Sequence, residues 1–316
     1  MIERILITDR VHSICVDQLR QAGLEVDYRP DLDYETFQEL LPNYEGVIIN
    51  SRSPMGRDNI LRAVNLRFIG RLGSGLDIID LPTAEEEGVE VISVPEGNAN
   101  AVAEHAMGML LSLMNRLVQA DREVRAGDWN REERRGIELG GKTVGLLGYG
   151  HTGRAMAKKL SGFDVKIKVY DKYKTNYAEG SRVVQECERE EVIRDADILS
   201  IHLPLTDETN GMIDSHFLSL CKKGFLLINT SRGKICQTAD ILSSLESGQL
   251  GGVAMDVLEA EGAKDLGQKK EQLYRDLFSE ERTIFSPHIA GWTQESLYKI
   301  GRLIAMKILN FANLEA

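Results

Sequence analysis

The chain has 316 residues, with 38 Lys and Arg against 49 Asp and Glu, so its formal net charge is -11. That length suggests about two domains at roughly 150 residues each. A hydrophobic content of 42% and a charged content of 28% are ordinary for a soluble globular protein and exclude a fibrous or largely disordered chain. The acidic balance argues against nucleic acid or an anionic membrane as the main partner, because both attract a basic surface.

The cysteines and the N-terminus predict a cytoplasmic protein. Cys15, Cys187, Cys221 and Cys236 are scattered, without the short spacing of a metal site or a redox pair. We therefore expect reduced thiols. The opening MIERILITDR lacks the apolar core of a signal peptide, and no apolar run approaches the roughly 20 residues of a membrane span.

The first hundred residues alternate β-rich runs with amphipathic segments, which favours a parallel sheet with crossover helices. The expected strands are RILITD (4–9), LEVDYR (24–29), GVIINS (46–51), LRFIGRL (66–72) and VEVISV (89–94). Residues 98–127 are then apolar enough for one long helix after an Asn N-cap. A domain contact or a dimer contact would explain that apolar length, and the polar residues 128–136 are expected to form a loop or an exposed arm.

A second βα series follows. Its expected strands are KTVGLLGYG (142–150), VKIKVYD (165–171), ADILSIHLP (196–204), GFLLINTS (224–231), GGVAMDVLE (251–259) and TIFSPHI (283–289). The charged stretch 264–282 is interpreted as a solvated surface helix. The last helix, 295–314, has no strand after it, so it could pack back on the first domain and make that domain discontinuous.

The sharpest local motif is the glycine-rich turn after the run TVGLLG. Gly148 permits a tight strand-to-helix turn, Gly150 lets the backbone approach a pyrophosphate, and Gly153 lets helix and strand pack closely. The next expected strand ends in Asp171, about where an acid that binds a ribose 2′-hydroxyl belongs. A carboxylate there favours NAD over NADP, although Lys172 beside it weakens that preference.

A competing motif covers residues 136–143, GIELGGKT, which fit the letters of a P-loop. A P-loop follows a strand and opens a helix. This segment instead follows a polar stretch and leads into a β-rich run, so we interpret the match as accidental. Binding of ATP that depends on Lys142 would be the sign of a P-loop protein.

Ionisable residues follow three of the expected strands, where α/β proteins place ligands. Arg232 could clamp a carboxylate, His288 could transfer a proton, and Glu261 could hold the histidine tautomer. Together they would suit proton transfer coupled to hydride transfer on an anionic substrate. From spacing alone, however, each of them fits a structural role at least as well.

Seven segments in order resemble the D-isomer-specific 2-hydroxyacid dehydrogenases, especially their D-3-phosphoglycerate dehydrogenase branch. These segments are RLGSGLDIIDL (71–81), NANAVAEHAMGMLL (98–111), TVGLLGYGHTGRAMAKKL (143–160), LSIHLPLTDET (199–209), LLINTSRG (226–233), AMDVLEAE (254–261) and SPHIAGWT (286–293). The resemblance implies an α/β protein with two doubly wound parallel-sheet domains and an active site between them. One is a Rossmann NAD-binding domain at 98–290, and the other is a flavodoxin-like, discontinuous substrate domain at 1–97 and 291–316.

Carried over by position, the resemblance makes Arg232 the substrate clamp, His288 the acid/base and Glu261 its support. Asp256 would face the nicotinamide carboxamide. The other implied dinucleotide contacts are Gly148, Gly150, His151, Thr152, Gly153, Asp171, His202, Pro204 and Thr230. For the substrate, the resemblance implies Ser74 and Gly75 at the carboxylate and Arg52 at a distal phosphate, with no metal.

The implied reaction is hydride transfer from NADH to a 2-oxo acid, with His288 protonating the carbonyl oxygen. Arg52 favours the pair D-3-phosphoglycerate and 3-phosphohydroxypyruvate, and thus a role in serine biosynthesis. Reduction of glyoxylate, hydroxypyruvate or another 2-oxo acid is the alternative, and an NAD-sensing corepressor is a remote one. The family usually forms a homodimer through its NAD-binding domain.

Two features depart from the family. Gly262 stands where a proline often follows the glutamate, and the segment from Gly262 to Thr283 is long and charged. These features leave the placement of Glu261 open. The chain also lacks room for the C-terminal regulatory domain of longer phosphoglycerate dehydrogenases, so feedback through such a domain is not expected.

Overall fold

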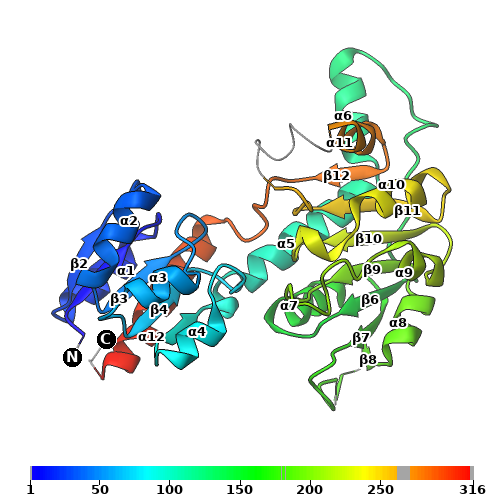
Figure 1. The fold of residues 1–316 in the computed structure, drawn as a ribbon. Coiled ribbons are helices and arrows are strands. Elements are labelled where there is room, and N and C mark those ends of the chain that lie inside the picture. Colours follow the sequence, from blue (N-terminus) through cyan, green and yellow to red (C-terminus); the bar gives the residue numbers. More distant parts are fainter. Residues whose placement is uncertain (1, 179, 182, 262–270, 314–316) are drawn as a thin grey trace. The chain divides into compact units, whose positions relative to one another are not determined.

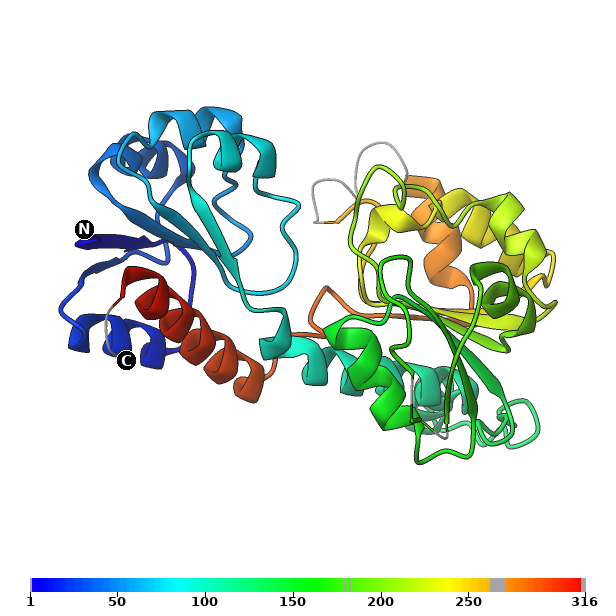
Figure 2. The ribbon, with the colours of Figure 1, turned by 90° about the horizontal axis from the view of Figure 1, so that it is seen from below.

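The computed structural model describes residues 2–178, 180–181, 183–261 and 271–313. The chain divides into two compact units: unit 1 is Met1–Ala99 with Trp292–Ala316, and unit 2 is Asn100–Gly291. Each unit contains one sheet with helices on both faces, which Figures 1 and 2 show for each unit. The predicted α/β class with two doubly wound parallel sheets is therefore confirmed.

Unit 1 has a five-stranded sheet in the order β2-β1-β3-β4-β5, with parallel pairing throughout. This is the flavodoxin-like doubly wound order. The strands are β1 (Arg4–Ile7), β2 (Glu25–Tyr28), β3 (Gly46–Ile49), β4 (Phe68–Arg71) and β5 (Glu90–Ser93). The helices are α1 (Ser13–Gln21), α2 (Tyr34–Leu40), the 3₁₀ helix η1 (Leu41–Asn43), α3 (Arg57–Arg62), α4 (Leu81–Glu86) and α12 (Gln294–Ala312).

Successive side chains along a strand point to opposite faces of a sheet, and this alternation builds two cores in unit 1. In β1, Ile5 and Ile7 join a buried cluster with α1 and α12, whereas Leu6 joins a second cluster with α2, α3 and α4. Figure 2 shows α12, in red, beside α1 on one face of this sheet. A slip of β1 by one residue would exchange the two sets of side chains.

The terminal helix α12 completes the core of unit 1. Its first turn is held by a capping box, in which Thr293 Oγ1 accepts from Ser296 N at 3.1 Å and Ser296 Oγ accepts from Thr293 N at 2.9 Å. A Cβ at Gly301 would lie 3.3 Å from the Cβ of His12, so the helix approaches the start of α1 closely. The segment after residue 291 therefore belongs to the core of the first hundred residues.

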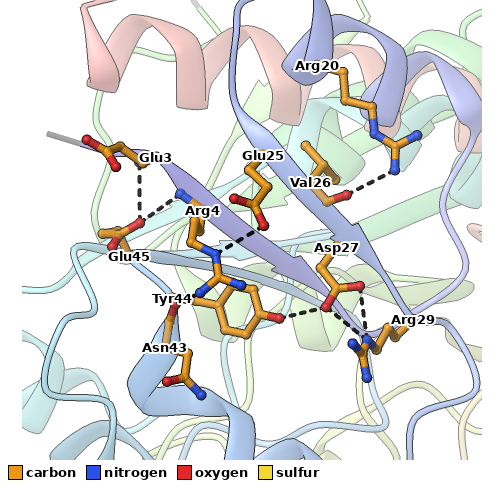
Figure 3. A network of polar contacts seen from close by, with 10 residues as sticks. All are labelled: Glu3, Arg4, Arg20, Glu25, Val26, Asp27, Arg29, Asn43, Tyr44 and Glu45. Carbon is orange, nitrogen blue, oxygen red and sulfur yellow. Dashed lines mark hydrogen bonds and ion pairs between the residues drawn. The ribbon is translucent and has the colours of Figure 1, made fainter.

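A polar network ties the β1–β2 edge of unit 1 to the loop before β3 (Figure 3). The buried Tyr44 donates its hydroxyl to Asp27 Oδ2 at 2.6 Å, and Arg29 Nε donates to the same carboxylate at 2.9 Å. The guanidinium of Arg4 lies 5.0 Å from the centre of the Tyr44 ring. Burial alone would raise the pKa of Asp27, but the hydrogen bonds from Arg29 and Tyr44 outweigh it, and the pKa is lowered.

Unit 2 has a seven-stranded parallel sheet in the order β12-β11-β10-β9-β6-β7-β8. Its strands are β6 (Thr143–Leu147), β7 (Lys166–Tyr170), β8 (Val184–Glu186), β9 (Ile198–Ile201), β10 (Phe225–Asn229), β11 (Leu250–Met255) and β12 (Thr283–Phe285). Its helices are α6 (Leu117–Ala126), α7 (His151–Leu160), α8 (Arg189–Asp195), α9 (Ser215–Leu220), η2 (Gly233–Ile235), α10 (Thr238–Glu246) and α11 (Glu271–Ser279), together with most of α5 (Pro95–Met114).

The central strand β6 places the core of unit 2. Val144 and Leu146 join a buried cluster with α5 and α7, whereas Leu147 joins the cluster on the face covered by α8 to α11. Gly145 lies toward α8, where a Cβ would be 2.8 Å from the Cγ1 of Val192. Both faces of the sheet are covered, which explains the continuous apolar runs that the sequence shows in its strands.

The prediction of one helix over 98–127 is wrong. The structure has α5 up to Met114 and a separate α6 from Leu117, with Arg116 between them in the left-handed region at φ 51°. Ile137 N donates to Met114 O at 3.0 Å, and Arg116 Nη1 donates to Glu133 O at 3.1 Å. Contacts from the segment 128–137 therefore stabilise the break.

Two smaller differences concern the surface of unit 2. Strand β8 was not expected. Residues 264–282 were predicted to form a solvated helix, and of these, residues 264–270 lie outside the described residues. The remainder contains α11, which buries Tyr274 and Leu277. Within the part of the chain that the structure describes, no helix has the length and apolarity to cross a membrane.

Candidate active site

The site in unit 2 begins where the strand order changes direction, between β6 and β9. The glycine-rich turn follows β6, and His202 follows β9. Gly148 has φ +95°, and a Cβ there would lie 2.4 Å from His202 O; a Cβ at Gly153 would lie 2.2 Å from Gly148 O. The two glycines thus permit the close strand, turn and helix packing that the sequence predicts. Parallel α/β sheets bind ligands at such a switch point.

Asp171 directly follows β7, the strand next to this turn. Its carboxylate accepts from Tyr149 N at 2.8 Å and from Tyr173 N at 3.1 Å, so it is fixed beside the glycine-rich turn. Lys172, which the sequence places next to it, pairs with Glu208 at 2.5 Å. The carboxylate of Glu208 thus offsets the positive charge of Lys172, which had weakened the expected preference for NAD over NADP.

The residues around the turn fit a dinucleotide. Gly150 is the N-cap of α7, and no atom lies within 4 Å of the place where its Cβ would stand, which leaves its backbone open to approach. His202 Nδ1 and Thr230 Oγ1 are buried polar atoms without a hydrogen-bond partner in the described protein. Burial lowers the pKa of His202 to about 4, so this ring is neutral at pH 7. Unpaired buried polar groups at a sheet edge are expected where a polar ligand completes their hydrogen bonds.

The other predicted dinucleotide contacts lie close by along the chain. His151 and Thr152 are the first two residues of α7, where helix N–H groups are free for an anion. Pro204 follows β9 and is exposed, and its carbonyl accepts from Thr209 Oγ1 at 2.7 Å.

Arg232 follows β10 on a loop held by its neighbours. The buried Asn229 donates Nδ2 to Arg232 O at 2.9 Å and accepts from Ser231 N at 3.0 Å. A Cβ at Gly233 would lie 1.8 Å from Leu258 O, so only glycine lets this loop pack against the segment after β11. The Arg232 loop and the Glu261 segment are therefore brought together by glycine packing.

His288 and Glu261 form the pair that the sequence predicts. His288 Nδ1 lies 2.9 Å from Glu261 Oε2, and both side chains are partly exposed. The hydrogen bond to Glu261 raises the pKa of His288, against the opposing effects of burial and of the nearby Arg232. His288 itself has φ 55°, a left-handed conformation that is uncommon outside glycine.

Asp256, at the end of β11, holds the backbone of the histidine loop. Its carbonyl accepts from His288 N at 2.8 Å, and its carboxylate accepts from Ile289 N at 2.9 Å and from Ala290 N at 2.8 Å. The carboxylate is buried. Of the predicted site residues, Arg232, Asp256, Glu261 and His288 therefore lie at one edge of the unit 2 sheet.

The sequence reasoning missed three residues that support this edge. Tyr274 of α11 accepts from Ala260 N at 2.9 Å and so fixes the chain next to Glu261. Ser286, after β12, donates a hydrogen bond to Asp256, and His105 of α5 is hydrogen-bonded to Ser286. Their signal was present only in part: Ser286 lies in the SPHIAGWT segment, but no spacing rule links it to a helix at 105. Gly262, which was expected to affect the placement of Glu261, lies outside the described residues.

The predicted substrate contacts of unit 1 lie at the carboxyl edge of its sheet. Arg52 follows β3, donates Nη1 to Pro30 O at 2.7 Å and lies 3.8 Å from Asp31. Ser74 and Gly75 follow β4 in a turn that begins at Gly73, whose φ is +143°. The guanidinium of Arg52 is thus directed toward the β2–α2 loop.

The P-loop interpretation is excluded by the local structure. Residues 136–142 form a loop that leads into β6 at Thr143, so a strand begins where a P-loop would begin a helix. The backbone around Lys142 is therefore not the phosphate cradle that this motif requires.

Comparisons with known proteins agree with this geometry. Residues 107–290, more than half of the chain, match the model of the D-isomer specific 2-hydroxyacid dehydrogenase, NAD binding domain. A D-3-phosphoglycerate dehydrogenase of Sus scrofa is 33% identical over 309 residues, which cover 98% of this chain and 56% of that protein. The chain thus spans about half the length of this curated relative.

Solved structures resemble the whole chain. A D-lactate dehydrogenase from Aquifex aeolicus, in complex with NAD and lactic acid, has a TM-score of 0.86 at 26% identity, covering 98% of this chain and 96% of that one. An NAD-dependent formate dehydrogenase from Staphylococcus aureus, in complex with NAD, has a TM-score of 0.82 at 27% identity, with coverage of 98% and 96%. The chain belongs to the D-isomer specific 2-hydroxyacid dehydrogenase family, whose NAD-binding domain residues 107–290 match.

Proposed function

We propose that the protein is an NAD-dependent dehydrogenase that interconverts a D-2-hydroxy acid and its 2-oxo acid. The observation that carries the proposal is the contact of 2.9 Å between His288 Nδ1 and Glu261 Oε2, at the sheet edge that also carries Arg232. This edge adjoins the glycine-rich turn of the NAD-binding domain. An acid/base, its supporting carboxylate and an arginine for an anion are the groups that such a reaction needs.

Each residue of the site has its own role in the proposed reaction. NADH, when bound at the glycine-rich turn, would supply the hydride. Arg232 binds the 2-oxo acid and polarises its carbonyl group, since a guanidinium can hold a carboxylate with two hydrogen bonds. His288, kept protonated by Glu261, donates its proton at the carbonyl oxygen. In the oxidative direction, neutral His288 accepts the hydroxyl proton.

For the cofactor, we infer a preference for NAD over NADP. Asp171 is fixed beside the glycine-rich turn, and a carboxylate there repels a 2′-phosphate. Asp256 accepts from one loop N–H on Oδ2, which leaves acceptor capacity on this oxygen for the nicotinamide carboxamide.

For the substrate, we infer the pair D-3-phosphoglycerate and 3-phosphohydroxypyruvate, with Arg52 at the phosphate and Ser74 and Gly75 at the carboxylate. The similarity to D-3-phosphoglycerate dehydrogenases supports this choice, and it would place the protein in serine biosynthesis. Glyoxylate, hydroxypyruvate or another 2-oxo acid is the second candidate, because the similar solved structures include a D-lactate dehydrogenase.

Oxidation of NADH by the purified protein tests the substrate. It is measured with 3-phosphohydroxypyruvate, hydroxypyruvate, glyoxylate and pyruvate, and each acid is repeated with NADPH. We expect the highest kcat/KM with the phosphorylated acid and NADH, and an Arg52→Ala variant that loses this preference. Activity on unphosphorylated acids alone would contradict the role of Arg52, and NAD binding without turnover would favour a sensor.

We also propose that unit 1 is the substrate domain, that unit 2 is the NAD-binding domain, and that two copies associate through unit 2. Exposed apolar side chains on α6 and the segment after it support a homodimer: Leu117 at 53%, Val124 at 53%, Trp129 at 76% and Ile137 at 52%. A cavity of about 390 Å³ lies among Leu113, Met114 and Ile137, among other residues. Light scattering should give twice the chain mass, and Trp129→Asp should give a monomer; a monomeric parent protein would refute the dimer.

The free thiols support a cytoplasmic location. Cys15, Cys187, Cys221 and Cys236 carry no disulfide. Thiols persist in the reducing cytoplasm.

A further inference from the structure

A chain of hydrogen bonds connects helix α5 to the loop that carries His288. His105 Nε2 lies 2.8 Å from Ser286 Oγ, and Ser286 Oγ lies 2.5 Å from Asp256 Oδ1. The three residues come from three elements: α5, the end of β12 and the end of β11. All of them lie within unit 2.

The chemistry of the groups sets the direction of these bonds. A carboxylate oxygen accepts hydrogen bonds, so Ser286 donates its hydroxyl proton to Oδ1 of Asp256. The serine oxygen is then the acceptor for His105, whose Nε2 therefore carries a proton. The direct distance of 3.7 Å between His105 Nε2 and Asp256 Oδ1 adds an attraction whenever the ring is charged.

The Asp256 carboxylate, at the end of this series of hydrogen bonds, determines the conformation of the loop that carries His288. It accepts from Ile289 N and Ala290 N, which directly follow His288. His288 has φ 55°, a conformation that a histidine adopts only when its surroundings hold it. Asp256 can hold the backbone of residues 288–290 in one conformation only if its own carboxylate is fixed. Ser286 fixes the Oδ1 atom of that carboxylate.

We propose that His105 and Ser286 are positioning residues for His288, which they orient through Asp256. The proposal rests on the proposed function, in which His288 is the acid/base. The charged groups that act on the pKa of His288 are Glu261, Arg232 and Asp256. Of these, Glu261 contacts the ring directly, and that contact requires the loop to keep its orientation. Loss of the hydroxyl of Ser286 or of the ring of His105 should let the loop move and loosen that contact.

The test compares Ser286→Ala and His105→Leu with conservative variants that keep the donors, Ser286→Thr and His105→Gln. Ser219→Ala is the matched control, because its hydroxyl donates to His216 O at 2.7 Å within α9. The first readout is the pKa of His288, which is measured by NMR on protein labelled with ¹³C-histidine. The signal of His288 is assigned by its absence from the His288→Gln variant. Fluorescence titration with NADH and turnover of the preferred 2-oxo acid complete the comparison.

We expect the pKa of His288 to fall toward its ordinary value of about 6.5 in Ser286→Ala and His105→Leu. Their kcat should fall about 10-fold or more, since small misplacements of a catalytic group are costly. The Kd for NADH should stay unchanged, and the conservative variants and the control should resemble the parent protein. Should Ser286→Ala fail to fold, His105→Leu decides.

The proposal is overturned if the pKa of His288 is the same in every variant. If the Kd for NADH also weakens in that case, the network serves cofactor binding alone. The NMR readout needs no turnover, so a parent protein that reduces none of the acids would count against the proposed function and leave this test intact.

Discussion

His288 owes its charge and its orientation to different partners. Glu261 contacts the ring and raises the pKa, whereas Asp256 holds the backbone through the N–H groups of residues 288–290. Because the pKa of His288 is raised in the folded state, its charged form stabilises the fold at pH values below the unfolded pKa. This contribution to stability is lost as the pH rises through the folded pKa. His288, the proposed catalytic acid, is thus protonated over a wider pH range than a free histidine.

Replacement of Glu261 by Gln tests this effect. The amide keeps a polar side chain of similar size but removes the negative charge, so the pKa of His288 should fall. The basic limb of the profile of kcat/KM against pH, measured for 2-oxo acid reduction, should therefore move to lower pH. A basic limb at the same pH in both proteins would show that Glu261 does not set the charge of His288.

Some site residues could be predicted from the sequence and others could not. Arg232, Glu261 and His288 stand in recognisable segments after expected strands, and the structure places Glu261 against His288. The roles of His105 and Tyr274 depend on contacts with residues more than ten positions away, on other elements. No local pattern encodes such contacts, because they exist only once the sheet has formed.

At the scale of elements, the glycine-rich turn was predictable and the end of α5 was not. Gly148 and Gly153 carry a local steric requirement that sequence spacing reveals. The break at Arg116 has neither Gly nor Pro, and its stabilising bonds come from Glu133 and Ile137 in the segment that follows α6. A helix end fixed by distant contacts leaves no signal in the helix itself.

Gly153→Ala tests the steric requirement of the turn. The added Cβ would lie 2.2 Å from the backbone oxygen of Gly148, so the turn has to open. We expect NADH binding to weaken at least about 10-fold, because the N–H groups of the turn no longer converge on the pyrophosphate. Gly162→Ala is the control, since nothing lies within 4 Å of a Cβ there. Equal Kd values for NADH in the two variants would contradict the prediction.

In unit 1, Tyr44→Phe tests the network of Figure 3. Loss of the hydroxyl removes one donor to Asp27, which should lower the free energy of unfolding by about 1–2 kcal/mol at pH 7. The pKa of Asp27 is lowered in the folded state, so this carboxylate stabilises the fold above its unfolded pKa. The difference between the two proteins should therefore shrink as the pH falls below about 4.

Urea unfolding at several pH values measures the effect. Tyr28→Phe serves as the control, because this tyrosine is partly exposed, at 38%. A difference between Tyr44→Phe and the parent protein that stays constant from neutral to acid pH would show that the hydroxyl does not act through the charge of Asp27.

At the scale of the whole molecule, the fold class followed from the repeated alternation of strands and helices. The sheet orders, β2-β1-β3-β4-β5 and β12-β11-β10-β9-β6-β7-β8, both have the doubly wound form that this alternation favours. Strand β8, with three residues from Val184 to Glu186, escaped prediction because it is short and carries little apolar periodicity. It lies at an edge of its sheet, away from the strands that carry Arg232, Asp256 and His288.

The central claim is that this chain is a dehydrogenase whose acid/base is His288. The measurement that tests it most directly compares NADH oxidation by the parent protein and by His288→Gln, with 3-phosphohydroxypyruvate and the other 2-oxo acids. General acid catalysis contributes about 10²- to 10⁴-fold, so the variant should lose at least about 100-fold in kcat. Its Kd for NADH should be unchanged. Equal turnover by the two proteins, or a parent protein that reduces none of the acids, would contradict the claim.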